Sequence, residues 1–104
     1  MRANKKVDKL FRDLMTALKE SSLDRFVANG DTNFRDKTKP EMVKKVSDQL
    51  SPRIGRAHTA TYLGYIVAPT FVDHLWRLKF RDKLGDRQAQ LSVKDDKVHA
   101  FYIF

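Results

Sequence analysis

Apolar residues near the start of the chain recur at helical spacing. Charged residues such as Lys5, Arg12 and Glu20 fall between them, on the opposite side of a helix drawn through this segment. The pattern predicts an amphipathic helix that packs on a core along one stripe. The stripe consists of Val7, Leu10, Phe11, Leu14, Met15 and Leu18.

Two short segments are expected to follow this helix. Ser21 and Asp24 have the spacing of a weak capping box, which predicts that a second short helix starts here and includes Phe26. Asn29–Gly30 is expected to end that helix, because both residues tolerate the left-handed backbone of a helix C-terminus. The segment 31–37 is expected to be irregular or a single turn, anchored by Phe34.

The strongest local signal is Thr38-Lys39-Pro40-Glu41. It combines a possible N-cap, a proline in the first turn and a glutamate at the capping-box position, so it predicts a helix start. Ser51–Pro52 is expected to end this helix, because a residue before proline avoids the helical region. Its predicted apolar stripe consists of Met42, Val43, Val46 and Leu50.

From Ala57 onward the apolar positions alternate with a period of two, which is typical of strands. Asp73 lies between Val72 and His74, so the Asp73 and His74 side chains are expected on opposite faces. Leu75 is the one apolar residue on the otherwise polar face. The turns at 82–86 and 95–97 are too short for a crossover, so the strands should pair antiparallel. The predicted buried face carries Val72, His74, Trp76, Leu78 and Phe80.

The last strand, 98–104, is apolar on both faces. The predicted alternation places Phe101 and Ile103 on one face and Val98, Ala100, Tyr102 and Phe104 on the other. Such a pattern indicates a central strand whose second face is covered by a partner or by a curl of its own sheet. We therefore expect a homodimer through an exposed apolar part of the sheet around Leu75, Phe101 and Ile103.

The length and composition of the chain restrict the classes of protein to which it can belong. A chain of 104 residues with 41% hydrophobic content can bury one small core, so we expect a single α+β domain over 1–104. Its helices should cover about 4–51 and its curved four-stranded antiparallel sheet about 57–104. The absence of cysteine excludes disulfides, a thiolate nucleophile and zinc sites with sulfur ligands. Without an apolar run long enough to cross a bilayer or an apolar signal segment, we expect a soluble cytoplasmic protein without a membrane partner.

The net charge of +8 raises the question of nucleic-acid binding. Basic and acidic residues number six and three in residues 1–20, eight and five in 21–56, and seven and five in 57–104. Because the basic excess is spread evenly along the chain, it favours a solubilising surface, and we do not expect a nucleic-acid partner. One basic stripe remains a candidate phosphate contact, with Tyr62 or Tyr65 as a stacking partner. It consists of Arg77, Lys79 and Arg81.

The order of helices followed by four strands, closed by Lys97-Val98-His99-Ala100-Phe101-Tyr102-Ile103 after an acidic turn, resembles the nuclear-transport-factor-2-like superfamily and its cystatin-like half-cone. Many small members end in Gly-Lys-Val-x-Gly-Phe; here Asp96 and Ala100 stand at the two glycine positions. The resemblance, strongest with a small uncharacterised subgroup, extends to Phe26, Asn29-Gly30-Asp31, Phe34, Pro40-Glu41 and Leu75-Trp76. It implies a curved sheet around the first helix and, in members that bind ligands, a pocket between sheet and helices.

The titratable residues offer few candidates for chemistry. Most acids lie at turns and helix ends, where they are typical of turn formation. No two of the three histidines have metal-ligand spacing, so we expect no metal, no cofactor and no catalytic residue. The sequence favours a non-catalytic binding or protein-interaction module. The alternative is a small-molecule-binding protein, or an isomerase-like or dehydratase-like enzyme, whose pocket is lined by His74, Trp76, Tyr62 and Tyr102.

Overall fold

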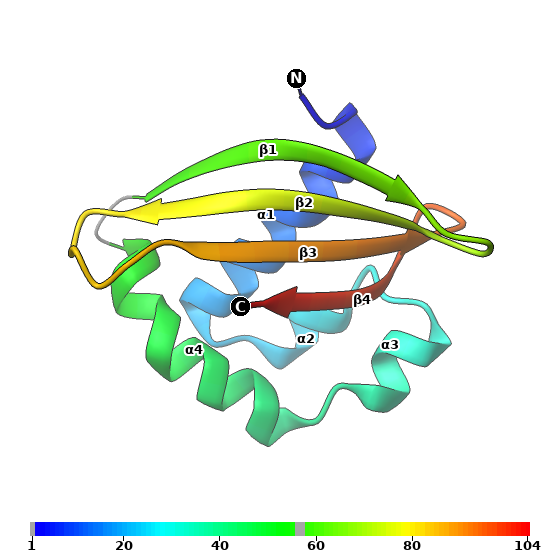
Figure 1. Cartoon of the computed structure of the whole chain (residues 1–104). Helices are drawn as coiled ribbons and strands as arrows, with labels where there is room; N and C mark the ends of the chain where they lie inside the picture. The colour runs from blue at the N-terminus through cyan, green and yellow to red at the C-terminus, as the bar shows by residue number, and fades with distance from the viewer. Residues whose placement is uncertain (1, 56–57) are drawn as a thin grey trace.

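The computed structural model describes residues 2–55 and 58–104, in which four helices precede four strands (Figure 1). The predicted start of the sheet at Ala57 lies outside the described residues. No helix in the described part is long and apolar enough to cross a membrane. The elements are α1 (Lys5–Glu20), α2 (Leu23–Val27), α3 (Thr32–Lys37), α4 (Pro40–Gly55), β1 (His58–Val67), β2 (Val72–Phe80), β3 (Arg87–Lys94) and β4 (Lys97–Ile103).

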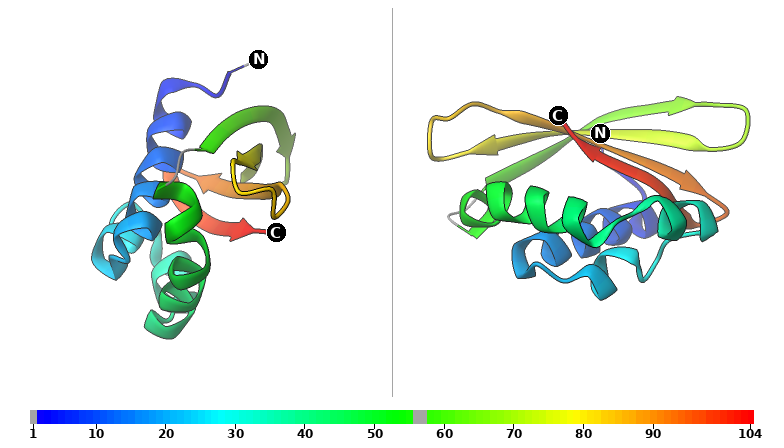
Figure 2. Two further views of the ribbon diagram at one scale, coloured as in Figure 1. Left: turned by 90° about the vertical axis from the view of Figure 1, so that its left-hand side faces the viewer. Right: turned by 90° about the horizontal axis from the view of Figure 1, so that it is seen from below.

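The strands form an antiparallel sheet in the order β1-β2-β3-β4, with the helices gathered on one side (Figure 2). We call this the helix-facing side, and the opposite side the outer face. The predicted α+β class, with helices packed on a curved four-stranded antiparallel sheet, is confirmed. The prediction that the last strand is central is wrong, because β4 is an edge strand among the described residues.

The core lies between α1 and the helix-facing side of the sheet. The rings of Phe11 and Trp76 stack with centroids 4.1 Å apart, and Trp76 is only 2% exposed. The whole predicted stripe of α1 is buried, and so are His74, Leu78 and Phe80 on β2. Full burial of one such large apolar side chain stabilises a fold by about 1.5–3 kcal/mol, so this layer holds helices and sheet together.

Side chains at the ends of α1 and α2 differ from the prediction in detail. Asn4 caps α1 by accepting the amide of Val7 at 2.9 Å. Ser21, predicted to cap α2, instead ends α1 in a left-handed conformation with φ of 54°. The cap of α2 is Ser22, whose hydroxyl accepts the amide of Arg25. The reason is that Ser21 is needed to close α1, which shifts the second helix by one residue.

Asn29 and Gly30 do not supply the left-handed stop predicted for α2. Ala28 ends α2 with right-handed dihedrals, and neither Asn29 nor Gly30 has a positive φ. Gly30 instead forms a parallel bridge with Val98 on β4. This pairing needs an extended backbone, which explains why the chain leaves the helix without a left-handed turn.

Helix α4 starts at Pro40 as predicted, but it continues through Pro52 to Gly55. Proline within a helix loses one backbone hydrogen bond, and here contacts of the last turn offset that loss. Ile54 is buried at 6% exposure, and Arg53 pairs with Asp82 in the turn before β3. Met42 does not belong to the buried stripe of α4, because its side chain is 56% exposed.

A β-bulge moves Val98 to the face of β4 opposite to the one predicted. The register with β3 shifts between Ser92 and Val93, so that Val93 pairs with Val98 whereas Ser92 pairs with Ala100. Val98 is therefore fully buried and does not share a face with Ala100, which is its predicted neighbour. The preceding turn, Asp95–Asp96, has φ of 52° and 62°, the geometry of a two-residue hairpin loop that matches the sheet twist.

Candidate functional site

A groove of about 530 Å³ runs along the edge of the sheet, between β4 and the helices α3 and α4. We call it the edge groove. Exposed Met42, Tyr102 and Phe104 line its rim. Apolar side chains from four helices and from β4 line the rest: Leu18, Phe26, Phe34, Val43, Phe101 and Ile103. Its size is within the range of ligand-binding clefts.

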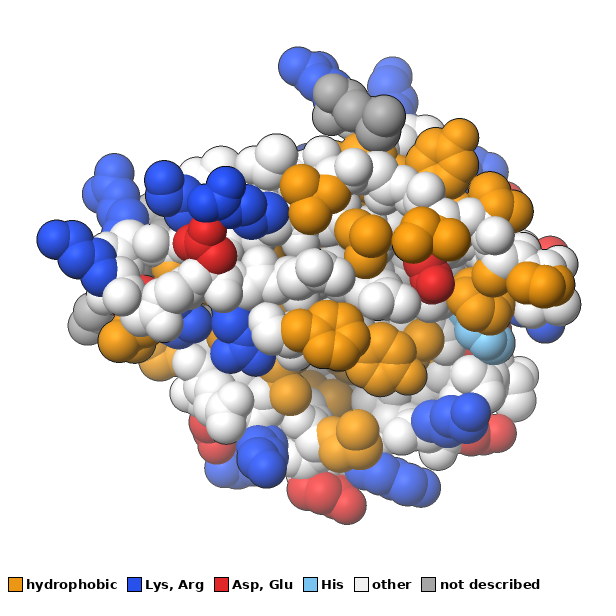
Figure 3. All heavy atoms as spheres, in the orientation of Figure 1, with side chains coloured by type: hydrophobic (Ala, Val, Ile, Leu, Met, Phe, Trp, Pro, Cys, Tyr) orange, Lys and Arg blue, Asp and Glu red, His pale blue; other side chains and the backbone are white. Residues whose placement is uncertain are grey.

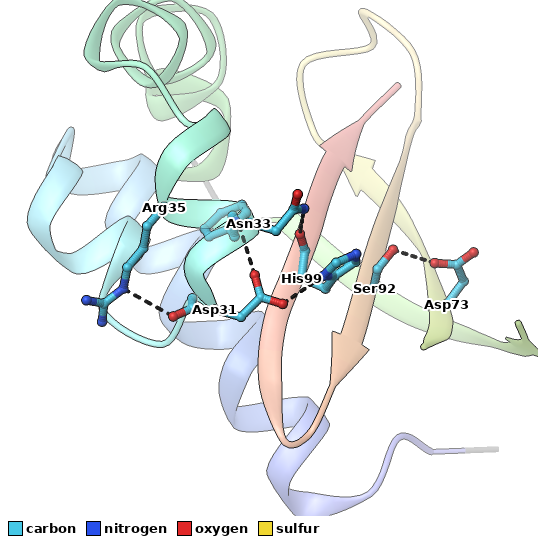
Figure 4. Close-up of polar contacts among 8 residues, drawn as sticks. Asp31, Asn33, Arg35, Asp73, Ser92 and His99 are labelled. Carbon is cyan, nitrogen blue, oxygen red and sulfur yellow. Dashed lines mark hydrogen bonds and ion pairs between the residues drawn. The ribbon is translucent and has the colours of Figure 1, made fainter. Parts of the chain in front are cut away.

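The edge groove meets a polar cluster where α3 approaches the start of β4 (Figure 4). Asp31 is the N-cap of α3, and its Oδ2 lies 2.7 Å from Nδ1 of His99 on β4. Asn33 donates from Nδ2 to the carbonyl oxygen of His99 at 3.3 Å. The guanidinium of Arg35 donates to the carbonyl oxygens of Gly30 and Ala28. These bonds fix α3 against the strand edge.

The electrostatics of this cluster favour an ionised Asp31. Partial burial opposes ionisation of the carboxyl, but the hydrogen bond from the Phe34 amide and the contacts with His99 outweigh it. The pKa of Asp31 is consequently lowered from its ordinary 3.8. Asp31 therefore carries its negative charge at neutral pH, as an N-terminal helix cap should.

A second polar pair lies beside the cluster, on the outer face. The hydroxyl of Ser92 donates to the carboxylate of Asp73, and both residues line the edge groove. The predicted separation of Asp73 and His74 onto opposite faces is confirmed, because His74 is buried on the helix-facing side. Among the described residues, no hydrogen bond joins His99 to Ser92. The geometry therefore does not pair a serine nucleophile with a histidine base.

Three of the four predicted pocket residues come together, but in the core. The hydroxyl of Tyr62 lies 2.7 Å from Nδ1 of His74, and the rings of Tyr62 and Trp76 meet edge to face at 5.3 Å. Phe11 covers Trp76 from the helix side. Tyr102, the fourth candidate, is 54% exposed and is the only one of the four that lines the edge groove.

Burial also shifts both titratable members of this group. It lowers the pKa of His74 below its ordinary 6.5, although the nearby Asp73 charge acts in the opposite direction. It raises the pKa of Tyr62 above 10.0, with a smaller contribution from Tyr65. His74 is thus a neutral imidazole at neutral pH, and it completes a hydrogen bond with Tyr62 inside the core. Packing of the core accounts for this pair without a functional role.

The predicted dimer residues do not share one face. Phe101 and Ile103 point to the helix-facing side, where the Phe101 ring contacts those of Phe11 and Phe26. Leu75 points to the outer face and is half-buried. The exposed apolar part of the outer face consists of other residues, namely Ile66, Tyr102 and Phe104.

The predicted basic stripe is only partly continuous. Arg77 and Lys79 are exposed on the outer face of β2, but Arg81 lies beyond the end of the strand, in the following turn. Arg77 pairs with Asp86 at 2.6 Å. Asp73, on the same face of β2, is bonded to Ser92. An acid from a turn therefore neutralises part of the stripe.

The Asp31–His99 pair was not predicted from the sequence. The two residues lie 68 positions apart, and no short motif links them. Asp31 does carry a usable signal, because it immediately precedes a segment that forms a helix, and aspartate is a preferred N-cap. No group of three or more His, Asp or Glu residues in the described ranges is arranged to hold a metal ion.

Comparison with known proteins gives little beyond the fold. No protein-family model and no curated protein matches the chain. Among solved structures, the chain is similar to an uncharacterized cystatin fold protein from Novosphingobium aromaticivorans, with 14% sequence identity and a TM-score of 0.44. The similarity covers 92% of this chain and 95% of that one.

Proposed function

We propose that this chain is a non-catalytic binding module that pairs with a second copy of itself through the outer face of its sheet. One observation carries the proposal. Exposed apolar side chains gather on that face (Figure 3), where a solvated sheet would carry polar residues. We call them the outer-face patch; it consists of Ile66, Leu75, Tyr102 and Phe104, of which all but half-buried Leu75 are 54–61% exposed.

The charges along β2 support a second copy as the occupant. Asp73, Leu75 and Arg77 follow one another on the outer face, so an acid and a base flank the apolar centre. Within its own chain Asp73 is bonded to Ser92 and Arg77 to Asp86, so a contact between two copies would add to these bonds. A two-fold axis that crosses the strands at Leu75 would place Asp73 of one copy opposite Arg77 of the other.

Membership of the nuclear-transport-factor-2-like superfamily is part of the proposal. The order of helices, the curved antiparallel sheet around α1 and the Lys97–Ile103 segment support it. An enzymatic pocket at Tyr62, His74 and Trp76 is less well supported, since Phe11 fills the space against Trp76. A fold of this kind hosts unrelated functions, so the outer-face patch, not the fold, carries the functional proposal.

The molar mass in solution tests the proposal. Size-exclusion chromatography with light scattering at tens of micromolar should give the mass of two chains for the wild type. Ile66→Asp and Leu75→Asp should give the mass of one chain, because each introduces a charge into the patch. Leu84→Asp is the matched control: Leu84 is 77% exposed, but it lies in the turn after β2 and outside the patch.

The charge arrangement is tested by a swap. Arg77→Asp should weaken the dimer by placing like charges opposite each other, and the double variant Asp73→Arg with Arg77→Asp should recover part of the loss. Recovery is partial because a carboxylate at position 77 also lies beside Asp86 of its own chain. A wild-type chain that is strictly monomeric at tens of micromolar contradicts the proposal. A dimer that survives both Ile66→Asp and Leu75→Asp contradicts it as well.

A further inference from the structure

The free edge of β4 is covered by the chain itself at one end only. The amide of Asp31 donates to the carbonyl oxygen of Val98 at 2.8 Å, and the amide of Val98 donates to that of Asn29 at 2.8 Å. These bonds make segment 29–31 a short parallel neighbour of β4. Asn33 then satisfies the carbonyl oxygen of His99. Beyond this point α3 turns away from the strand (Figure 1).

Alternate residues of β4 point their backbone N–H and C=O groups toward β3, and the residues between them point these groups outward. Gln88 and Phe104 exchange two backbone bonds, of 2.8 and 3.2 Å. In an antiparallel pair such exchanges alternate, so Tyr102 bonds to β3 and the residues on either side of it point away. The open groups are the N–H and C=O of Phe101 and the N–H of Ile103. Within residues 2–55 and 58–104 no backbone hydrogen bond from outside the β3–β4 ladder reaches any of the three.

These open groups lie beside the edge groove. Phe101 and Ile103 form its near wall, whereas Met42 and Val46 of α4 form its far wall. The outer-face patch is not needed for this arrangement, so the inference that follows does not rest on the pairing of two copies. An unpaired strand edge next to an apolar cleft is the arrangement that binds an extended peptide by strand addition.

We propose that the edge groove binds an extended peptide as an additional strand along β4, continuing the pairing that segment 29–31 begins. A peptide fits better than β4 of a second copy, because that strand would bring its own α4 into the same space. Peptide residues that face the helices would meet Phe26, Phe34 and Val43, so they should be apolar at alternate positions.

The charge at one end of the groove sets a further requirement. The edge groove shares Asn33 and His99 with a neighbouring cavity of about 480 Å³ that is lined by the cations Arg35, Lys94 and Lys97 and by the acids Asp31 and Asp95. Asp31 is already held by His99. Lys37 lines the edge groove itself. Three cations against two acids in this cavity, together with Lys37, leave this end positive, so it is complementary to an acidic residue or a carboxylate. The expected ligand is therefore a peptide with alternating apolar residues and an acidic end.

A phage-displayed library of random peptides of about ten residues provides the probe. It is selected on immobilised wild-type protein after depletion on Ile103→Pro. Proline removes the amide that faces the groove, and an edge strand tolerates proline where the nitrogen points away from its neighbour. Ile103→Ala is the matched control, because it loses the same side chain and keeps the amide. Circular dichroism and the Tm check that both variants fold.

Selected peptides should bind the wild type and Ile103→Ala with similar Kd and Ile103→Pro at least about tenfold more weakly. They should carry the alternating apolar residues and the acidic end. N-methylation of alternate amides on one edge of the peptide should abolish binding, and N-methylation on the other edge should not. Peptide binding should slow hydrogen exchange at Phe101 and Ile103, whereas Tyr102 should be protected already in the free protein.

A selection that yields no peptide able to separate the wild type from Ile103→Pro overturns the proposal. Binding that survives N-methylation on both edges overturns it as well. If sodium decanoate binds the groove and no peptide does, the groove is a site for an anionic amphiphile and the peptide proposal is wrong. None of these results bears on the dimer, which the light-scattering mass of Ile66→Asp tests separately.

Discussion

The carboxylate of Asp31 joins two elements that are 68 positions apart in the sequence. Its Oδ1 accepts the amide of Phe34 at 2.9 Å, and its Oδ2 lies 2.7 Å from Nδ1 of His99. One side chain therefore caps α3 and ties that helix to β4. Because these contacts favour the charged form, ionisation of Asp31 and folding are linked.

Asp31→Asn should remove an acid-dependent part of the stability. The pKa of Asp31 is lowered from 3.8 on folding, so its contribution is complete above pH 3.8 and is lost as the pH falls through the lower folded pKa. Urea unfolding between about pH 2 and about pH 7 measures it. The stability difference between wild type and variant should shrink toward the acidic end.

Two further variants separate the roles of Asp31. Asp31→Ala loses the cap as well and should cost about 0.5–2 kcal/mol at neutral pH. Asp36→Asn, at an exposed carboxylate on the same helix, is the matched control and should follow the wild-type profile. A wild-type pH profile in Asp31→Asn would show that the link between charge and folding is absent.

Sequence periodicity predicted the layers of this fold well, and features that depend on a single residue less well. The stripe of α1 and the alternation of β2 were correct because each repeats over many positions, so one exception such as Leu75 does not hide the pattern. The face of Val98 was wrong because one inserted residue at the bulge moves it to the other side of β4, whereas the predicted separation of Phe101 and Ile103 from Tyr102 was correct. A short apolar strand gives no signal of a bulge.

The candidate sites were predicted less well for a related reason. Periodicity placed His74 and Trp76 on one face, and Tyr62 was predicted to line a pocket with them, but no pattern indicated the Phe11 ring that fills the space beside them. The edge groove depends on how α4 lies relative to β4, which no local pattern encodes. The end of α4 was misplaced because Pro52 is a strong local stop signal, whereas the contacts of Arg53 and Ile54 that extend the helix are tertiary.

The buried His74 should make the stability sensitive to mild acid. Burial lowers the pKa of His74 below 6.5, so the unfolded chain binds a proton more readily than the folded one. Stability should therefore fall as the pH drops below 6.5, until the folded pKa is reached, by up to about 1.4 kcal/mol per pH unit. Urea unfolding between about pH 7.5 and about pH 5 checks the slope.

Two variants show whether His74 causes this dependence of stability on pH. His74→Phe should reduce it, because the titrating group is removed. Tyr62→Phe should keep it, because the imidazole stays buried beside Trp76 when the hydrogen bond is lost. Equal slopes in the wild type and His74→Phe would exclude His74 as the source.

Two glycines should respond in opposite directions to alanine. A Cβ at Gly30 would lie 2.6 Å from Cδ2 of Phe34 and 3.2 Å from the carbonyl oxygen of Val27, so Gly30→Ala must displace a buried ring and should cost about 1–3 kcal/mol. Among the residues that the structure describes, a Cβ at Gly55 meets only Cε of Lys19 at 4.0 Å, so Gly55→Ala should stabilise the fold by about 0.4–1 kcal/mol. The Tm of each variant decides. A Tm that rises in Gly30→Ala would contradict the tight approach of α3 to this backbone.

Arg53 should contribute more to stability than any exposed ion pair of the chain. Its Nε and Nη2 donate to both carboxylate oxygens of Asp82 at 2.6 and 3.0 Å, and Nη2 also donates to the carbonyl oxygen of Gly85. Its Cζ lies 4.1 Å above the ring of Phe80. The two side chains are only 12% and 10% exposed, so Arg53→Ala should cost about 3–5 kcal/mol.

A conservative variant keeps this test informative if the alanine variant does not fold. Arg53→Lys retains the charge but loses the planar fork, so it should still be clearly less stable than the wild type. The control is Lys44→Ala, which breaks an exposed pair with Asp48 (side chains 74% and 62% exposed) and should cost at most about 0.5 kcal/mol. Guanidinium chloride would screen these charges, so urea unfolding is the measurement to use. If Arg53→Lys is as stable as the wild type, charge alone holds the end of α4 against the turn before β3, and the bidentate geometry is dispensable.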